Sequence, residues 1–460
     1  WRAVMAEEFT FANVRRALVG ISRYVASKKS QGARVIVGRD PRFLGESFCS
    51  MAAEILSSHA ITPVMVAEAA PTPALAYAVV QSGADGVINF TASHNPPEYN
   101  GIKFSTPDGC PALPEVTKKI EQEIPDGDEA APAAGASGKD GGIDVESLDA
   151  KPGYLKRLAE IIDIEAIRKA NLRVCFDPMW GAARGYPDGL LRDAGVNVAT
   201  VHDYRDVMFG GHAPEPDDHL LEPLREKMRA TGAHIGIATD GDADRFGIVD
   251  ADGTFLQPNY VIALLFDYLV ESRGWKNGVA KSVATTNLIN AIAQARGVQL
   301  YETPVGFKYI GELIMQDKIA IGGEESAGLS IRHHTPEKDG VLAGLLCCEM
   351  VARRGKPLGE QLKALCNQVG SYYPERQNFR LTPEVKEKFT GKLKTDPREF
   401  CGRSVTEVVR TDGLKLIFED GSWVCYRLSG TEPVVRVYSE ARSESGLEKL
   451  SSAAKQWIFE

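Results

Sequence analysis

Three stretches of the chain repeat one order of elements, and this repetition constrains the fold more than any other feature. In the first stretch, the β-branched run ARVIVGRD leads through a turn to the helical pattern ESFCSMAAEILSSHA and then to ITPVMV. Such runs bounded by turns predict strands, and a strand–helix–strand order predicts a βαβ unit. The order recurs in NLRVCFDP, YPDGLLRDAG and VNVATV, and in KSVATTN, LINAIAQARG and VQLYETP. We therefore predict three related α/β units in tandem.

Changes in composition indicate where these units begin and end. Residues 125–142 (PDGDEAAPAAGASGKDGG) lack large apolar side chains, which predicts a flexible loop or linker. A helical stretch, residues 152–169, leads into the second unit, and from about Ser371 a different order of strands and helices predicts a smaller α+β domain. We expect three α/β domains with mixed sheets and a C-terminal α+β domain, at residues 1–149, 150–251, 252–369 and 370–460.

Charge and hydropathy exclude several classes of partner. The 53 basic and 62 acidic residues give a net charge of −9, which disfavours nucleic acid or an anionic membrane as the main partner. No apolar run reaches the roughly 18 residues of a membrane span, and the best candidate, residues 260–270, contains Asp267. The eight cysteines lack a C-x-x-C spacing, which favours reduced thiols over disulfides or a metal cage. We expect a cytoplasmic protein, either a monomer or a dimer.

Four predicted strands each end in a polar or glycine-rich loop. They are GVINF before TASHN, HIGIA before TDGDADR, KIAIG before GEESAG, and WVCYR before LSGTEP. Ligands of α/β sheets bind at the carboxyl ends of strands, because helix N-termini and open backbone N–H groups meet at that edge. We expect the four loops to line one shared cleft.

The second loop carries three carboxylates at alternate positions, Asp240, Asp242 and Asp244. Their mutual repulsion is costly unless a cation lies among them, and a hard divalent ion prefers such oxygen ligands. An EF-hand is excluded, because its sixth and twelfth positions would be Arg245 and Ala251 instead of Gly and Glu. On these residues alone, a solvated acidic turn is as good an explanation as a metal site.

The first loop places Ser93 beside His94, with Lys103 a short distance on. Ser93 lacks the G-x-S-x-G elbow of an α/β-hydrolase nucleophile. A phosphorylated serine fits better, because its phosphate would add about −1.5 to −2 charge and further oxygen ligands. Three aspartates alone provide too few ligands for Mg²⁺. His94 and Lys103 could then neutralise the phosphate or move protons. A local hydrogen bond or helix cap is the alternative for the Ser-His pair.

The third and fourth loops offer groups that bind hydroxyls and phosphates. Glu324 and Ser326 of GEESAG supply acceptors and a donor suited to vicinal hydroxyls, although a helix N-terminus with first-turn acids explains them equally well. The fourth loop combines guanidinium, hydroxyl and backbone N–H donors suited to a phosphate dianion, and a β-turn with surface arginines is the alternative. Its residues are Arg427, Ser429, Gly430, Thr431 and Arg436. Lys308, His334 and Lys338 are individually typical of a solvated face.

As a set, the four loops resemble the α-D-phosphohexomutase superfamily, that is, the phosphoglucomutases and phosphomannomutases. TASHNP-x-x-x-NG-x-K, DGDADR, GEESAG and R-x-SGTEP follow the family's order across essentially the whole chain. The resemblance implies four domains around a central cleft. The family also carries G-T-[SD]-G before the Trp-Arg pair found here as Trp1 and Arg2, so we expect residues ahead of Trp1.

The resemblance also implies roles for individual residues. It assigns catalysis, including proton transfer and phosphate contact, to Ser93, His94, Lys103 and Arg245. It assigns Mg²⁺ to the phosphate of Ser93 together with Asp240, Asp242 and Asp244. It assigns substrate binding to Lys308, Glu324, Ser326, His334, Lys338, Arg427, Ser429, Gly430, Thr431 and Arg436.

The implied activity is interconversion of hexose 1-phosphates and 6-phosphates through a phosphoserine. A hexose 1,6-bisphosphate would be the intermediate and the activator. GEESAG with H-x-x-EKDG resembles phosphoglucomutases, so glucose is the expected sugar, with a phosphomannomutase or phosphoglucosamine mutase as the alternative. A non-catalytic sugar-phosphate-binding protein and a Mg²⁺-dependent phosphatase are more distant alternatives.

Overall fold

The computed structural model describes residues 1–126, 145–429 and 433–459 and divides into two compact units. Unit 1 comprises Trp1–Pro258, Gly311–Asp317 and Ser326–Leu358, and unit 2 comprises Asn259–Ile310, Lys318–Glu325 and Gly359–Glu460. The predicted linker, residues 125–142, lies almost entirely outside the described residues. Among the helices that the structure describes, none is long and apolar enough to cross a membrane.

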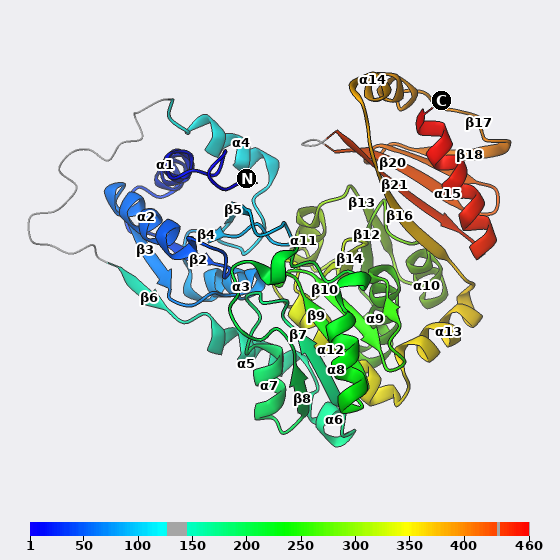
Figure 1. Ribbon diagram of the computed structural model, residues 1–460, viewed down its shortest axis with the longest axis horizontal. Helices are drawn as coiled ribbons and strands as arrows, with labels where there is room; N and C mark the ends of the chain where they lie inside the picture. The colour runs from blue at the N-terminus through cyan, green and yellow to red at the C-terminus, as the bar shows by residue number, and fades with distance from the viewer. Residues whose placement is uncertain (127–144, 430–432, 460) are drawn as a thin grey trace, which may run out of the picture. The chain divides into compact units, whose positions relative to one another are not determined.

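The first sheet of unit 1 is mixed and is covered by helices on both faces (Figure 1). Its elements are β1 (Arg2–Val4), α1 (Phe11–Lys28), β2 (Ala33–Arg39), α2 (Gly45–Ser58), β3 (Ile61–Val66), α3 (Thr72–Ser82), β4 (Val87–Phe90), β5 (Tyr99–Ser105), α4 (Pro114–Gln122) and β6 (Glu146–Leu148). The strand order is β1-β5-β4-β2-β3-β6, in which β1 and β5 run antiparallel to their neighbours and the others are parallel.

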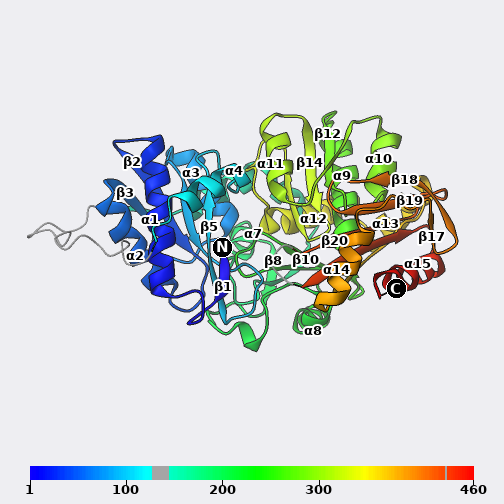
Figure 2. The same ribbon diagram turned by 90° about the horizontal axis from the view of Figure 1, so that it is seen from above.

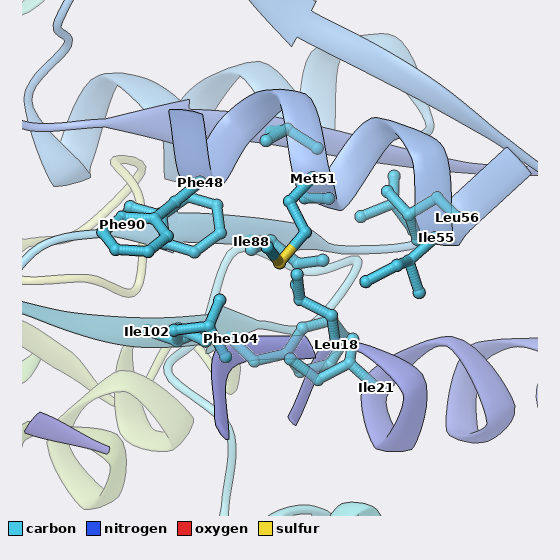
Figure 3. Packing of buried hydrophobic residues seen from close by; sticks show 14 of the residues in the cluster. Leu18, Ile21, Phe48, Met51, Ile55, Leu56, Ile88, Phe90, Ile102 and Phe104 are labelled. Atoms are coloured by element: carbon cyan, nitrogen blue, oxygen red, sulfur yellow. The ribbon is translucent and has the colours of Figure 1, made fainter. Parts of the chain in front are cut away.

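The β-branched run of β2 explains this layering. Val35 and Val37 pack into one cluster with residues of α1 and α2, while Ile36 packs into another with residues of α3. Successive side chains of a strand point to opposite faces, so an unbroken apolar run is buried on both. Figure 3 shows the first cluster, in which the stacked rings of Phe48 and Phe90 connect α2 to β4.

The second sheet of unit 1 has the order β11-β10-β9-β7-β8. Its elements are β7 (Arg173–Asp177), α7 (Pro187–Asp193), β8 (Asn197–Thr200), η2 (Phe209–Gly211), η3 (Asp218–Leu220), α8 (Glu222–Thr231), β9 (Ile235–Thr239), β10 (Phe246–Asp250) and β11 (Phe255–Leu256). Leu224 and Met228 of α8 pack on one face, and α12 (Gly340–Arg354) packs on β9 and β10, with Gly344 against Ile237. The expected α/β layering is therefore present here too.

The single helical stretch predicted for residues 152–169 is wrong, since the chain forms α5 (Lys151–Ile161) and α6 (Ile164–Lys169). Ile162 has an extended backbone between them. The side chain of Asp163 accepts a hydrogen bond from the backbone N–H of Ala166 and so caps the start of α6. Aspartate is among the residues preferred at this position, which is why the chain restarts a helix there.

In unit 2, the central strand β12 (Gly278–Ser282) is parallel to β13 (Leu300–Thr303) and to β14 (Ile319–Glu324). The helices of unit 2 are α9 (Pro258–Arg273), α10 (Leu288–Arg296) and α13 (Leu358–Val369), together with the part of α11 (Phe307–Met315) that precedes Gly311. Helix α10 lies beside β12 (Figure 2). The strand predicted in KSVATTN ends at Ser282, because Lys281 Nζ donates to Thr285 O and to Asn287 Oδ1 and so folds residues 283–287 into a loop.

The C-terminal part of unit 2 is a second, antiparallel sheet with the order β16-β21-β20-β19-β18-β17. Its elements are β16 (Tyr373–Arg380), α14 (Pro383–Lys392), β17 (Glu399–Phe400), β18 (Arg403–Val409), β19 (Leu414–Phe418), β20 (Trp423–Leu428), β21 (Val434–Ala441) and α15 (Glu444–Phe459). Leu450 and Ala454 of α15 and Phe389 of α14 pack with Val424 and Tyr426. This confirms the α+β class expected for the end of the chain.

Three of the four predicted loops join antiparallel strands, namely β4 to β5, β9 to β10, and β20 to β21. A returning strand therefore follows each of these three loops. The segments after the loops, such as YNGIKF and RFGIVD, are rich in β-branched and aromatic residues, which favour a returning strand. The hairpin brings Lys103 back opposite Asn89, close to the loop that contains Ser93.

Candidate active site

Ser93 lies at the tip of the hairpin between β4 and β5, and its side chain is buried. Its backbone is left-handed, with φ at 53°, a conformation that costs energy for any residue other than glycine. The hydroxyl Oγ donates a hydrogen bond to Asp240 Oδ2 at 2.7 Å, and the backbone N–H donates to Thr91 Oγ1 at 2.8 Å. The serine thus points directly at the acidic loop.

The three aspartates lie in the turn between β9 and β10 and are fully buried. Their carboxylates each offer one oxygen, and these oxygens lie within 4.8 Å of one another. Gly241 sits against the serine hairpin so closely that an added Cβ would lie 2.6 Å from Ser93 O. A side chain at position 241 would therefore separate the two loops, which explains the glycine between the first two aspartates.

Three basic side chains surround the acids. Lys103 Nζ donates to Asp242 Oδ2 at 2.6 Å and to Asp244 Oδ2 at 2.8 Å, and Lys338 Nζ donates to Asp244 Oδ2 at 2.7 Å. The backbone N–H of Arg245 donates to Asp240 Oδ1 at 3.0 Å, and its guanidinium donates to Glu215 Oε1 at 3.1 Å. The predicted residues of both loops, with Lys338, are therefore brought together.

Burial and charge act differently on the three acids. Burial, together with Asp242 and Asp244, raises the pKa of Asp240 well above its usual range. Burial also opposes ionisation of Asp244, but Lys103, Lys338 and Arg245 hold the pKa of this carboxyl well below its usual range. Burial lowers the pKa of Lys103, but Asp242 and Asp244 outweigh burial and raise it above the ordinary lysine value.

Two carboxylate oxygens of this cluster are left without a partner. Asp242 Oδ1 and Asp244 Oδ1 are buried and accept no hydrogen bond from the part of the chain that the structure describes. A buried acceptor without a partner carries a desolvation cost, which a bound cation would remove. With three carboxylates in reach of one point, the donor set fits a hard divalent ion.

The two candidate histidines have different surroundings. His94 Nδ1 lies 3.4 Å from Ser93 Oγ, and burial with the nearby Arg245 lowers the pKa of His94, which favours the neutral imidazole. The side chain of His334 is fully buried, and its Nε2 lies 2.7 Å from Asp339 Oδ2, which also accepts from Tyr154. His334 therefore supports Asp339 at the start of α12.

Glu324 ends β14 in unit 2, where its Oε1 accepts a hydrogen bond from the backbone N–H of Gly306 at 2.7 Å. Lys308 lies nearby in sequence, and its Nζ is 5.0 Å from the centre of the Tyr309 ring. Ser326 is half-buried and belongs to unit 1, in the turn before β15 (Gly328–Ile331).

The glycines of GEESAG have a packing role that their sequence does not reveal. Gly322 and Gly323 lie inside β14, where an added Cβ would collide with Ile310 and Ile262 respectively. Their small size therefore lets Ile310 of α11 and Ile262 of α9 approach the strand.

Arg427 and Arg436 are directly opposite each other on β20 and β21. Arg427 is held by Asp412, with Nη2 and Oδ2 2.8 Å apart. Directly opposite residues of an antiparallel pair share a face, so both arginine side chains lie on one face of the sheet. Ser429 follows β20 and is half-buried, whereas Gly430 and Thr431 lie outside the described residues.

Sequence reasoning missed several residues that hold the acids in place. Thr72 Oγ1 donates to Asp242 Oδ2 at 2.6 Å, and Asn89 Nδ2 donates to Thr72 Oγ1 at 2.9 Å. A signal for Asn89 existed, since it is the polar residue in the apolar run GVINF. Glu215, which pairs with Arg245, lies in the segment HAPEPDD, and no sequence pattern singles it out.

Sequence profiles of the phosphoglucomutase/phosphomannomutase family match the chain in four consecutive segments. The profiles of alpha/beta/alpha domains I, II and III match residues 1–131, 152–253 and 257–369, and the profile of the C-terminal domain matches residues 383–455. The chain therefore belongs to this family, whose members are mutase enzymes. The expected fold class, three tandem α/β domains and a smaller C-terminal one, is confirmed.

Similar proteins support the class of enzyme but carry different substrate names. A phosphoglucomutase/phosphomannomutase of Thermococcus kodakarensis is 33% identical over 410 residues, covering 89% of this chain and 86% of the relative. A "Probable phosphoglucosamine mutase" of Methanopyrus kandleri is 32% identical, with 91% and 88% covered. A crystal structure of a Thermus thermophilus protein assigned as a phosphomannomutase is 32% identical, with a TM-score of 0.85 and coverage of 100% and 97%.

Proposed function

We propose that the chain interconverts the 1-phosphate and the 6-phosphate of glucose through a phosphorylated Ser93. The observation that carries the proposal is the hydrogen bond from Ser93 Oγ to Asp240, inside a buried acidic cluster that Lys103 and Lys338 face. Phosphoryl transfer depends chiefly on positioning and on stabilisation of charge. The cluster offers both at the hydroxyl of one serine.

In the first half-reaction, the free hydroxyl oxygen of the hexose monophosphate forms a bond to the phosphorus on Ser93, while the bond from that phosphorus to Ser93 Oγ breaks. The hydroxyl proton passes to the neutral imidazole of His94, or to Lys103 in its uncharged form, which Asp242 and Asp244 disfavour by raising the pKa of this amine. Such help contributes about 10² to 10⁴ in rate. In the second half-reaction, Ser93 Oγ forms a bond to the phosphorus of the other phosphate of the hexose 1,6-bisphosphate, while the bond from that phosphorus to the sugar oxygen breaks. The proton taken up in the first half-reaction passes to this sugar oxygen. The bisphosphate is thus the intermediate, and it also activates protein that has lost its phosphate.

We propose Mg²⁺ as the ion of the acidic cluster. Asp240, Asp242, Asp244 and the phosphate on Ser93 would hold it, and the unpartnered buried oxygens of Asp242 and Asp244 support this assignment. When bound, the ion supplies positive charge to the phosphoryl oxygens. Arg245 would contact the same phosphoryl group, since its backbone N–H already binds Asp240.

The residues of the other loops are proposed to bind the substrate. Glu324 and Ser326 would hold sugar hydroxyls, and the opposed guanidiniums of Arg427 and Arg436 support a site for the non-reacting phosphate. The further proposed contacts are Lys308, His334, Lys338, Ser429, Gly430 and Thr431. We also propose domain boundaries after residues 149, 251 and 369, which the spacing of the four family profiles supports.

A turnover assay tests the proposed reaction and its sugar. The purified protein is given Mg²⁺, a trace of glucose 1,6-bisphosphate, and in turn glucose 1-phosphate, mannose 1-phosphate or glucosamine 1-phosphate, and each 6-phosphate is measured. We expect the highest kcat/KM with glucose 1-phosphate. Ser93→Ala should abolish turnover, while Ser50→Ala, on the exposed side of α2, should retain it.

Each other outcome identifies a different function. A preference for mannose or glucosamine 1-phosphate would overturn the choice of glucose while keeping the mutase reaction. Steady release of inorganic phosphate with no need for the bisphosphate would indicate a phosphatase. Binding of sugar phosphates without turnover would indicate a non-catalytic binding protein.

A further inference from the structure

Arg42 follows β2 and has a fully buried side chain whose hydrogen bonds nearly all go to the serine hairpin. Its two terminal nitrogens donate to four main-chain carbonyl oxygens, those of Ser93 at 2.8 Å, Asn95 at 2.5 Å, Pro96 at 2.8 Å and Tyr99 at 2.9 Å. Its Nε donates to Asp40 Oδ2 at 3.1 Å, and its guanidinium lies 4.9 Å from the centre of the Phe209 ring. All five guanidinium donors are therefore used.

Thr91 connects the same ion pair to the other side of Ser93. Its Oγ1 donates to Asp40 Oδ2 at 2.6 Å and accepts from the backbone N–H of Ser93 at 2.8 Å. Asp40 Oδ1 accepts from the backbone N–H of Arg42 at 3.0 Å. Asp40, Arg42 and Thr91, which we call the serine clamp, thus hold both the N–H and the carbonyl oxygen of Ser93.

Holding both backbone groups fixes the conformation of this residue. The left-handed φ of 53° at Ser93 is unfavourable for a residue with a side chain, so it persists only where surrounding bonds over-determine it. That conformation directs Oγ at Asp240 Oδ2, 2.7 Å away. None of the hydrogen bonds of the clamp residues goes to the three aspartates or to the basic residues around them.

We propose that the serine clamp is a positioning device that sets the rate of phosphoryl transfer at Ser93 without binding the substrate. This inference rests on the proposed function. Its physical basis is that Ser93 Oγ, the phosphorus and the sugar oxygen must lie in line during the transfer. A misplacement near 1 Å costs about 10²-fold in rate. A buried ion pair that served stability alone would not need to hold four carbonyl groups of one hairpin.

The first test uses a matched pair of substitutions at Thr91. Thr91→Val keeps the shape of the side chain and removes both hydrogen bonds, whereas Thr91→Ser keeps the hydroxyl. For Thr91→Val we expect kcat to fall by about 10- to 100-fold with KM for the sugar phosphate unchanged. Thr91→Ser should restore most of the loss.

The second test substitutes Arg42. Removing its charge would leave Asp40 buried without a partner, which endangers folding. Arg42→Lys keeps the charge beside Asp40 but has a single terminal nitrogen for four carbonyl oxygens, so we expect a similar fall in kcat. Arg23→Lys, at an exposed arginine of α1 that donates to Glu123 O, is the control and should match the wild type.

The deciding measurement is the rate at which glucose 1,6-bisphosphate phosphorylates Ser93, followed by intact mass in folded variants with melting temperatures near that of the wild type. Slower phosphorylation in Thr91→Val and Arg42→Lys, at unchanged KM, is the expected result. Wild-type phosphorylation and kcat in both variants would overturn the inference, as would a fall explained by partial unfolding. A wild type that never gains phosphate would overturn the proposed function first, and the clamp's catalytic role with it.

Discussion

Replacing Gly241 with alanine should slow the reaction without unfolding the protein. The new Cβ would lie 2.6 Å from Ser93 O and 3.0 Å from Pro214 Cγ, whereas ordinary contact begins at 3.4 Å. The serine hairpin and the aspartate turn must therefore separate by about 0.8 Å, because packed protein interiors cannot absorb such an overlap.

The expected fall in kcat follows from the two segments that meet at this contact, the serine hairpin and the aspartate turn. The separation acts on the residue that carries Oγ and on the turn that carries its partner Asp240, now 2.7 Å apart. A misplacement near 1 Å costs about 10²-fold in rate, which equals about 2.7 kcal/mol of transition-state stabilisation. We therefore expect kcat of Gly241→Ala to fall by about 10²-fold, with little change in KM.

The assay is steady-state conversion of glucose 1-phosphate at saturating Mg²⁺ and bisphosphate. Gly189→Ala is the matched control, because Gly189 lies in α7 and an added Cβ there meets nothing within 4 Å. Alanine in a helix is favoured over glycine by about 0.5–1 kcal/mol, so this control should be at least as stable as the wild type and fully active. A wild-type kcat for Gly241→Ala would refute the reasoning, as would equal losses in both variants.

Three further predictions concern the metal, pH and unit 2. Asp242→Asn should weaken Mg²⁺ binding by at least about tenfold in calorimetry, because it removes one ligand charge. Burial and Lys415 lower the pKa of Lys281 to about 8 from 10.5. The unfolded chain therefore binds more protons at this site between pH 8 and pH 10.5. The free energy of unfolding should thus rise with pH in this range, by up to about 1.4 kcal/mol per pH unit. Urea titrations of Lys281→Met should no longer show this slope. Glu440 accepts from Thr286 Oγ1, from the backbone N–H of Asn287 and from Trp423 Nε1. Glu440→Gln should thus lower the unfolding free energy of the chain by about 1–3 kcal/mol, unlike Glu419→Gln at an exposed position.

The acidic cluster could be predicted from sequence because its main parts are local. Three aspartates at alternate positions of one turn stay close in any conformation of that turn, and Ser93 with Lys103 belongs to one hairpin. What the sequence could not supply is the pairing of distant segments. Thr72 donates a hydrogen bond to Asp242, which lies 170 positions away in the chain. The sequence pattern around Thr72 does not indicate this contact.

Other differences have local causes that a periodic pattern does not reveal. The helix predicted for residues 152–169 is interrupted because Asp163 caps a new helix, while the apolar pattern continues through the break. The side chain of His334 contacts Asp339, and the sequence motif that contains His334 does not reveal this partner. In both cases the partner of one polar side chain cannot be read from hydrophobic periodicity.

The most direct test of the account is transfer of labelled phosphate from glucose 1,6-bisphosphate to the protein. We predict that the label appears on the peptide containing Ser93, is absent in Ser93→Ala, and passes to the sugar when unlabelled glucose 1-phosphate is added. A protein that turns over substrate without ever carrying the label on Ser93 would contradict the central claim.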